Sequence, residues 1–374
     1  MERKKPKSKL KIILGIIIIA FLVIALGVFV FLKQSFLKSF PELNGEPEPG
    51  TWYEVPVEGA KSSDGSEWHG IFRKGTENKV VVYFFGGGVS ITPETSEGGK
   101  KFYATTMLAQ DFVAQGGIGS SAEENPFKGW NFIVIPYATG DFHAGTGTYE
   151  GKKTVYHTGY SNYSAFIEQI KPYVGDPDTL LVTGFSAGGF ATSLLADDVI
   201  DRFPGAENVT VCVDSSLLLY DGWHDTAVEL WKSPEEISDR LTTNNLVLDS
   251  LTALHEKRGD SVKILFDCSF RDNTLMQYQS YIDSGKMDRT KELGDVFQRD
   301  LKEMVNGLQT NIPGVGIYIW SFEEDPDTHN TQHTIISYNV FDKLGNDRSV
   351  GEWMFDAVNG DVRTYGLELL DKAF

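Results

Sequence analysis

Cysteine is scarce in this sequence. Only two of its 374 residues, Cys212 and Cys268, are cysteines. Two thiols can form at most one disulfide, so the class of small secreted domains that are stabilised by several disulfides is excluded. Both lie in segments that we expect to be neighbouring strands. They are therefore interpreted as two buried thiols, with a single disulfide as the alternative if the two strands pair closely.

Basic residues are also in short supply. The chain has 34 lysines and arginines against 52 acidic residues, a formal net charge of −18. Residues 1–32 hold six of the basic residues and one acidic residue, which leaves 28 against 51 and a net charge of −23 for the rest. Nucleic acids and anionic lipid surfaces both select basic patches, so we expect no nucleic-acid partner. A neutral or lightly charged ligand stays compatible with this charge, and simple solubility explains the charge equally well.

Long apolar runs are absent apart from one near the amino terminus. Residues 12–32 contain no charge and follow a cluster of basic residues. At about 1.5 Å per residue they can cross a hydrocarbon core of about 30 Å. Positive flanks stay cytoplasmic, and the exit FLKQSF lacks the small-residue pattern of a cleavable signal peptide. We predict a cell-membrane protein with a basic cytoplasmic tail (1–11), an uncleaved anchor (12–32), a Pro- and Glu-containing linker (33–50) and one external domain (51–374).

The stretch 180–192, LLVTGFSAGGFAT, is the most informative part of the external domain. An apolar run enters a Gly-x-Ser-x-Gly turn, and a helix-like segment leaves it. This is the pattern of a nucleophile elbow, in which Gly184 and Gly188 permit a sharp strand-to-helix turn that projects Ser186. The Ala187 N–H then points toward an oxyanion at the start of the helix. An ordinary βα turn with an incidental serine is the alternative.

Later segments supply an acid and a histidine in the order that α/β-hydrolases use. The strand candidate over 208–214 ends at Asp214, and the candidates over 261–270 and 316–322 are followed by Asp272 and by a loop with His329 and His333, respectively. Each candidate lies past the carboxyl end of an expected parallel strand, where α/β sheets gather their sites. We favour Asp272 over Asp214, whose alternative role is a structural carboxylate that binds N–H groups. His329 and His333 lack the companions of a zinc motif, so we predict no metal site.

A glycine-rich turn completes the set. The expected strand VVVYFFGGG (80–88) ends in three glycines, whose backbone can approach a ligand closely. We predict that Gly87 and Gly88 form an oxyanion hole together with Ala187. Asp141 and His143, at the end of another expected strand, are further candidates for substrate binding, although Asp141 could equally cap a turn.

Four segments make the chain resemble the pectin acetylesterase family, which also includes the Notum carboxylesterases. They are YFFGGGVS (83–90), NPFKGWNFIVIPYATGDFHAG (125–145), GFSAGGFA (184–191) and QHTII (332–336). The resemblance, to a membrane-anchored member of bacterial type, implies ester hydrolysis by a triad of Ser186, Asp272 and His333. It implies no cofactor.

Three positions depart from that family's pattern. Val89 and Ser90 stand where a Trp and a Cys are usual, and Ala138 stands where a Cys is usual. These differences leave the substrate more open than the chemistry.

These observations together predict an α/β-hydrolase-like fold, with a mostly parallel sheet, helices on both faces and lid insertions. The insertions are expected over 90–128 and 217–257, and the second carries Tyr220, Trp223 and Trp231. The expected activity is removal of O-acetyl groups from an extracellular carbohydrate. Two other functions stay open: a deacylase for longer acyl esters, and a surface binding module on a hydrolase scaffold that has lost activity.

Overall fold

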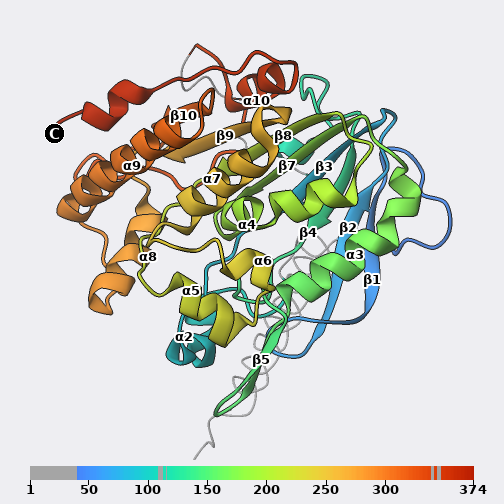
Figure 1. Ribbon diagram of the computed structural model, residues 1–374, viewed down its shortest axis with the longest axis horizontal. Helices are drawn as coiled ribbons and strands as arrows, with labels where there is room; N and C mark the ends of the chain where they lie inside the picture. The colour runs from blue at the N-terminus through green and yellow to red at the C-terminus, as the bar shows by residue number, and fades with distance from the viewer. Residues whose placement is uncertain (1–39, 108–112, 115, 338–340, 343–346) are drawn as a thin grey trace, which may run out of the picture. The chain divides into compact units, whose positions relative to one another are not determined.

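A sheet of eight strands, ordered β1-β2-β4-β3-β7-β8-β9-β10, forms the centre of the structure (Figure 1). The computed structural model describes residues 40–107, 113–114, 116–337, 341–342 and 347–374. The predicted cytoplasmic tail and membrane anchor lie outside these residues. Residues 41–374 make up one compact unit. Within the described residues, no helix combines the length and the apolar character that spanning a membrane requires.

Parallel pairing joins six of the eight strands. The bounds of these six are β3 (Lys79–Phe84), β4 (Asn131–Ile135), β7 (Thr179–Phe185), β8 (Asn208–Asp214), β9 (Val262–Ser269) and β10 (Gly316–Trp320). They are almost entirely buried, which explains their continuous runs of Val, Ile and Leu. At one edge, β2 (Glu67–Arg73) pairs antiparallel with β4 and with β1 (Trp52–Lys61), so β2 is reversed and β1 runs in the same direction as β4. A separate hairpin pairs β5 (Gly147–Glu150) with β6 (Thr154–His157).

Helices cover both faces of the sheet, as predicted. Alternation along the strands puts Phe84 and Gly184 on one face and Tyr318 on the other. Helix α3 (Gly159–Val174) packs Tyr163 on Phe84, and α4 (Ala187–Arg202) packs against Gly184. Helix α10 (Val350–Val358) packs Trp353 on Tyr318, hence on the opposite face. The fold is therefore the predicted α/β arrangement.

Three further helices follow the strands in the second half of the chain. They are α7 (Leu246–Arg258), α8 (Asn273–Ser284) and α9 (Lys291–Asn311). Helix α7 lies in front of the sheet beside α4 in Figure 1. Helix α9 has a strongly amphipathic sequence and buries residues such as Phe297, Leu301 and Leu308.

The two expected insertions contain short helices. The first holds α2 (Pro93–Gly98), which begins with a capping box between Thr92 and Thr95. The second holds α5 (Trp223–Asp225), a π-helical turn over Thr226–Trp231 and α6 (Glu235–Ser238). Trp223 and Trp231 are fully buried and pack on Phe142, so these two aromatics fill the core instead of lining a surface. Cys212 and Cys268 are both buried free thiols.

The end of the predicted linker packs on the sheet. Glu54 N–H donates to Pro41 C=O at 3.0 Å, and Leu43 N–H donates to Glu54 C=O at 2.8 Å. The compact unit therefore begins near Pro41, inside the segment that was expected to be an extended linker.

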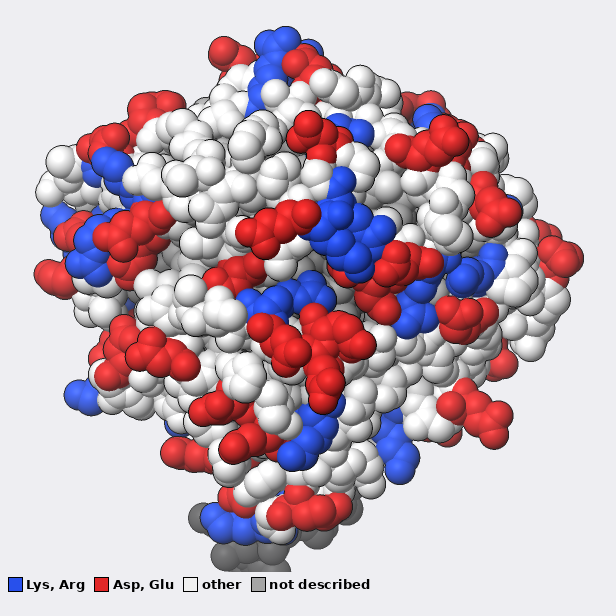
Figure 2. All heavy atoms as spheres, in the orientation of Figure 1, with Lys and Arg blue, Asp and Glu red and all other residues white. Residues whose placement is uncertain are grey.

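Acidic side chains are spread over the face of the molecule in Figure 2, with lysines and arginines between them. Several acidic side chains of the described residues form local ion pairs; Asp197, for example, accepts from Lys257 at 2.7 Å and from Arg258 at 2.6 Å. This face therefore presents mixed charge, which is the expected character of a solvated surface.

Candidate active site

Ser186 occupies the sharp turn between β7 and α4. Its backbone is left-handed, with φ 56° and ψ −126°, and its residue is partly exposed between buried neighbours. The turn needs glycine at its far side, because a Cβ on Gly188 would lie 2.0 Å from the carbonyl oxygen of Phe84. Non-glycine residues adopt such a backbone at a cost and are concentrated at functional sites. The local sequence therefore produces the strained elbow geometry expected of a nucleophile.

Asp272 and His333 are hydrogen-bonded to each other. The Oδ2 atom of Asp272 lies 2.6 Å from Nδ1 of His333. Asp272 is fully buried, caps the start of α8, and accepts the N–H groups of Thr274 and Leu275 on Oδ1, both at 2.9 Å. Oδ1 thus holds the Asp272 side chain at the start of α8, and Oδ2 binds the imidazole of His333. An ionised carboxylate only accepts, so the proton sits on Nδ1 and the lone pair sits on Nε2.

The Nε2 atom of His333 is buried and has no hydrogen-bond partner among the described residues. A buried nitrogen without a partner is unusual and calls for a functional explanation. With Nδ1 committed to Asp272, Nε2 is available to accept a proton from a hydroxyl group.

The two competing candidates have other partners. Asp214 is fully buried and accepts the N–H groups of Ile335 at 2.9 Å and Ile336 at 3.0 Å. His329 bonds through Nδ1 to Glu324 at 2.8 Å. Asp214 therefore binds backbone N–H groups, and His329 pairs with Glu324, whereas His333 is the histidine that contacts Asp272.

The glycine turn lies against the elbow. A Cβ on Gly86 would lie 2.8 Å from Cβ of Ser186. Gly88 pairs with Tyr103 in an isolated antiparallel bridge. The hydrogen bonds beside this pair run from Val89 N–H to Phe102 C=O at 3.1 Å and from Ala104 N–H to Gly87 C=O at 2.8 Å. The Gly88 N–H therefore points away from Tyr103. Ala187 is the first residue of α4, where N–H groups lack an acceptor within the helix.

Asp141 and His143 support the glycine turn from inside the protein. Both are buried, and Asp141 accepts from Thr139 at 2.6 Å, from His143 N–H at 3.1 Å and from Gly159 N–H at 2.8 Å. Burial lowers the pKa of His143 to about 4, so the ring is neutral and donates from Nε2 to Phe85 C=O at 2.9 Å. The carbonyl of Phe85 directly precedes the turn. These two candidates thus contact the scaffold of the site and not its solvent-facing side.

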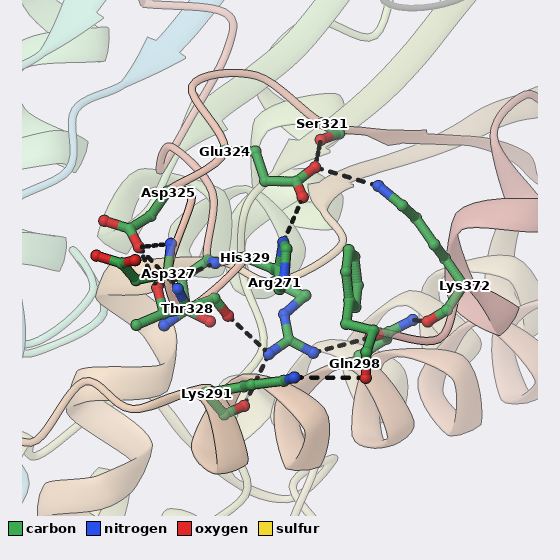
Figure 3. A network of polar contacts seen from close by, with 12 residues as sticks. Arg271, Lys291, Gln298, Ser321, Glu324, Asp325, Asp327, Thr328, His329 and Lys372 are labelled. Carbon is green, nitrogen blue, oxygen red and sulfur yellow. Dashed lines mark hydrogen bonds and ion pairs between the residues drawn. The ribbon is translucent and has the colours of Figure 1, made fainter.

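A buried guanidinium next to Asp272 holds the histidine loop (Figure 3). Arg271 donates to Lys291 C=O at 2.7 Å, to Thr328 C=O at 3.1 Å and to Gln298 at 3.2 Å, and it pairs with Asp295. It thereby joins the loop over 321–333 to α9. This role was not predicted from the sequence, although an arginine beside the candidate acid was the signal for it.

A cavity of about 340 Å³ opens beside the glycine turn. Its lining residues are Gly87, Lys100, Phe102, Tyr103, Ala104, Thr105, Thr106 and Tyr278. Tyr278 donates its hydroxyl to Phe102 C=O at 2.6 Å, and burial raises the pKa of that phenol to about 12. Val89 is buried and is not among the lining residues. The cavity has the size of a small-ligand site, and three of its eight lining residues are aromatic.

Comparison with known proteins relates this chain to a family of esterases. Residues 52–228 match the sequence model of the pectinacetylesterase family. The matched part includes the glycine turn and Ser186 and ends before Asp272 and His333.

A solved structure shares the fold. The crystal structure of the Wnt deacylase Notum from Drosophila is similar with a TM-score of 0.62 at 16% sequence identity. The alignment covers 84% of this chain and 95% of that one.

Proposed function

We propose that this protein is a serine carboxylic-ester hydrolase with Ser186 as nucleophile, His333 as general base and Asp272 as the acid that orients the base. The observation that carries the proposal is the 2.6 Å contact between Asp272 and Nδ1 of His333, with no partner for Nε2 in the part of the chain that the structure describes. The strained backbone of Ser186 and the match of residues 52–228 to an esterase family support it.

The chemistry begins with attack of the Ser186 hydroxyl on the acyl carbon of the ester. His333 takes the hydroxyl proton on Nε2 and then gives it to the leaving alcohol. Asp272 keeps the proton on Nδ1 and stabilises the imidazolium that forms. The bonds from Thr274 and Leu275 hold the Asp272 carboxylate in place, so its orientation does not have to be created during the reaction.

The tetrahedral intermediate carries a negative oxygen that needs donors already in place. The N–H groups of Gly87, Gly88 and Ala187 are proposed to bind it, and each such donor is worth roughly 2.7–4 kcal/mol in the transition state. Water then attacks the acyl-enzyme, with His333 again acting as base, and releases the acid. No step of this sequence requires a metal or an organic cofactor.

The proposed substrate is an O-acetyl ester of an extracellular carbohydrate. The family description of the matching segment and the predicted external location of the domain support this substrate class. The predicted anchor over 12–32 would tether the domain to the outside of the cell membrane. The net charge of −23 outside residues 1–32 fits a neutral or lightly charged glycan better than nucleic acid.

A deacylase for longer acyl esters is the second candidate. The Drosophila structure of similar fold is titled a Wnt deacylase, and the 340 Å³ cavity beside Gly87 is larger than an acetyl group needs. The third candidate, a binding module without activity, does not explain why Nε2 of His333 is buried without a hydrogen-bond partner among the described residues.

The decisive experiment compares acyl chain lengths on the full-length protein. Specificity constants for acetyl, butyryl and octanoyl esters are measured beside acetate release from several acetylated polysaccharides. We expect the acetyl ester to be preferred and acetate to be released from at least one polysaccharide. A specificity constant that rises with chain length, without acetate release, would select the second candidate, and no turnover of any ester would select the third.

A further inference from the structure

Asp214, at the carboxyl end of β8, is bonded to two parts of the active site at once. Its backbone C=O accepts the N–H of Ser186 at 2.9 Å. Its side-chain Oδ2 accepts the N–H groups of Ile335 and Ile336, two and three residues after His333. One buried residue therefore ties the nucleophile elbow to the loop that carries the histidine.

Three non-glycine residues next to these bonds have left-handed backbones. Their φ values are 56° at Ser186, 54° at Ser215 and 64° at Thr334. Such conformations persist where surrounding contacts enforce them. Ser215 donates its hydroxyl to Oδ1 of Asp214 at 2.6 Å, and Thr334 directly precedes the two N–H groups bound by Oδ2. The contacts of Asp214 thus lie beside three residues with strained backbones.

Asp267 faces Asp214 from the neighbouring strand. The two residues are paired in register between β8 and β9, both are fully buried, and their carboxyl groups share a hydrogen bond. Trp320 donates its indole N–H to Oδ1 of Asp267 at 3.2 Å. Cys212 Sγ on β8 lies 3.9 Å from Oδ2, so Oδ2 is the oxygen directed toward β8.

The shared proton belongs to Asp267. Burial, and then the charge of Asp214, raise the pKa of Asp267 well above its usual range. Burial raises the pKa of Asp214 as well, but hydrogen bonds from Ser215, Ile336 and Ile335 to its carboxylate oppose that rise. Two carboxylates in contact cannot both be ionised, so the one with more donors keeps the charge. Asp267 is then a neutral acid that donates to Asp214.

We propose that Asp214 is a positioning residue of the active site, which holds the His333 loop against the Ser186 elbow, and that Asp267 serves as its neutral hydrogen-bond donor. The inference rests on the proposed ester hydrolysis and deepens it. Neither residue contacts substrate. Their effect is exerted on the alignment of Ser186 and His333, to which the rate of the acyl transfer is sensitive.

Four variants of the full-length protein test this role. Asp214→Asn removes the charge that binds the two N–H groups, and Asp267→Asn retains a neutral donor of nearly the same shape. Asp267→Leu retains the size but cannot donate. Val211→Ala, on the same strand but on the opposite face of the sheet, is the control for a general loss of stability.

The expected result is an asymmetry in kcat for acetyl-ester hydrolysis. Asp214→Asn and Asp267→Leu should lower kcat about 10- to 100-fold with little change in KM, because a misaligned reacting pair slows chemistry more than binding. Asp267→Asn and Val211→Ala should stay within about threefold of the wild type, since each retains the donor to Asp214.

The outcomes separate this inference from the proposed function. An active wild type whose kcat is unchanged in Asp214→Asn overturns the positioning role alone. Equal kcat values for Asp267→Asn and Asp267→Leu also overturn it, and this comparison decides the matter if Asp214→Asn does not fold. A wild type that hydrolyses no ester overturns the proposed function, and the positioning role with it.

Discussion

Asp272 and His333 are 61 residues apart in sequence, and their side chains meet at 2.6 Å. The contact forms because β9 and β10 are parallel neighbours whose carboxyl ends lie at the same edge of the sheet. Asp272 is held by the first turn of α8, and the loop that carries His333 is held by Arg271 and Asp214. The candidate catalytic pair therefore depends on at least three separate elements.

Ser186→Ala should abolish ester hydrolysis. Loss of a triad nucleophile removes most of the rate enhancement, which for such enzymes amounts to about 10⁶-fold in kcat. Hydrolysis of an activated acetyl ester, together with labelling by a fluorophosphonate, measures the effect. Ser193→Ala, a buried serine further along α4, is the matched control and should keep both properties. Unchanged turnover in Ser186→Ala would refute the assignment of the nucleophile.

Asp272→Asn should reduce kcat by about 10⁴-fold, because an amide in place of the acid favours the wrong imidazole tautomer. This loss is far larger than the one expected for Asp214→Asn. His333→Ala should likewise be much more damaging than His329→Ala, since His329 pairs with Glu324. Steady-state kinetics on folded variants, with circular dichroism as the check of folding, decides both comparisons. A larger effect at Asp214 or His329 would move the catalytic group to the other loop.

Asp267→Asn should make the free energy of unfolding less dependent on pH. The pKa of Asp267 is raised in the folded protein, so between about pH 4 and that raised value the unfolded chain binds one proton fewer. Stability therefore falls as pH rises, by up to about 1.4 kcal/mol per pH unit from this group. Burial also raises the pKa values of neighbouring Cys212 and Cys268 well above the usual range, but an unfolded thiol ionises only near about pH 8.5, so these two groups add little slope below about pH 7.5.

Denaturant unfolding of wild type and Asp267→Asn from pH 5 to pH 8 measures that difference. The variant should gain stability relative to the wild type as pH increases. Parallel pH profiles for the two proteins would show that Asp267 is ionised in the fold.

Arg271→Lys should destabilise the protein by more than about 2 kcal/mol, because a lysine cannot make the several directed bonds of the buried guanidinium. Arg299→Lys is the control, since Arg299 is exposed and pairs with its neighbour Asp300. Thermal unfolding of both variants gives the comparison. Equal melting temperatures would mean that the network of Figure 3 contributes little to the stability of the loop.

Local patterns in the sequence predicted the strands and the elbow. The strand expected over 208–214 has those bounds, and the run ending in Gly86, Gly87 and Gly88 is β3 followed by the turn. A continuous apolar run identifies a buried parallel strand without reference to its neighbours, and the glycines around Ser186 impose the turn by themselves. The order of nucleophile, acid and histidine along the chain could also be predicted, because local patterns identify the strands that precede these residues.

Other features depended on residues far apart in the sequence. Trp223 and Trp231 lie in an insertion that the sequence predicted, but their packing partner, Phe142, could not be identified from the sequence. The pairing of Asp214 with Asp267, and the bonds from Arg271 to Lys291 and Thr328, join segments that no local pattern connects.

The sequence by itself determined the α/β layout and the candidate nucleophile, because periodicity and glycine placement act within a few residues. Only the tertiary structure decided which carboxylate faces the histidine. Asp214 ends β8, Asp272 follows the neighbouring strand β9, and the two side chains are chemically identical. They differ in the groups that they contact in the folded protein. Asp214 meets two backbone N–H groups, whereas Asp272 meets the imidazole of His333.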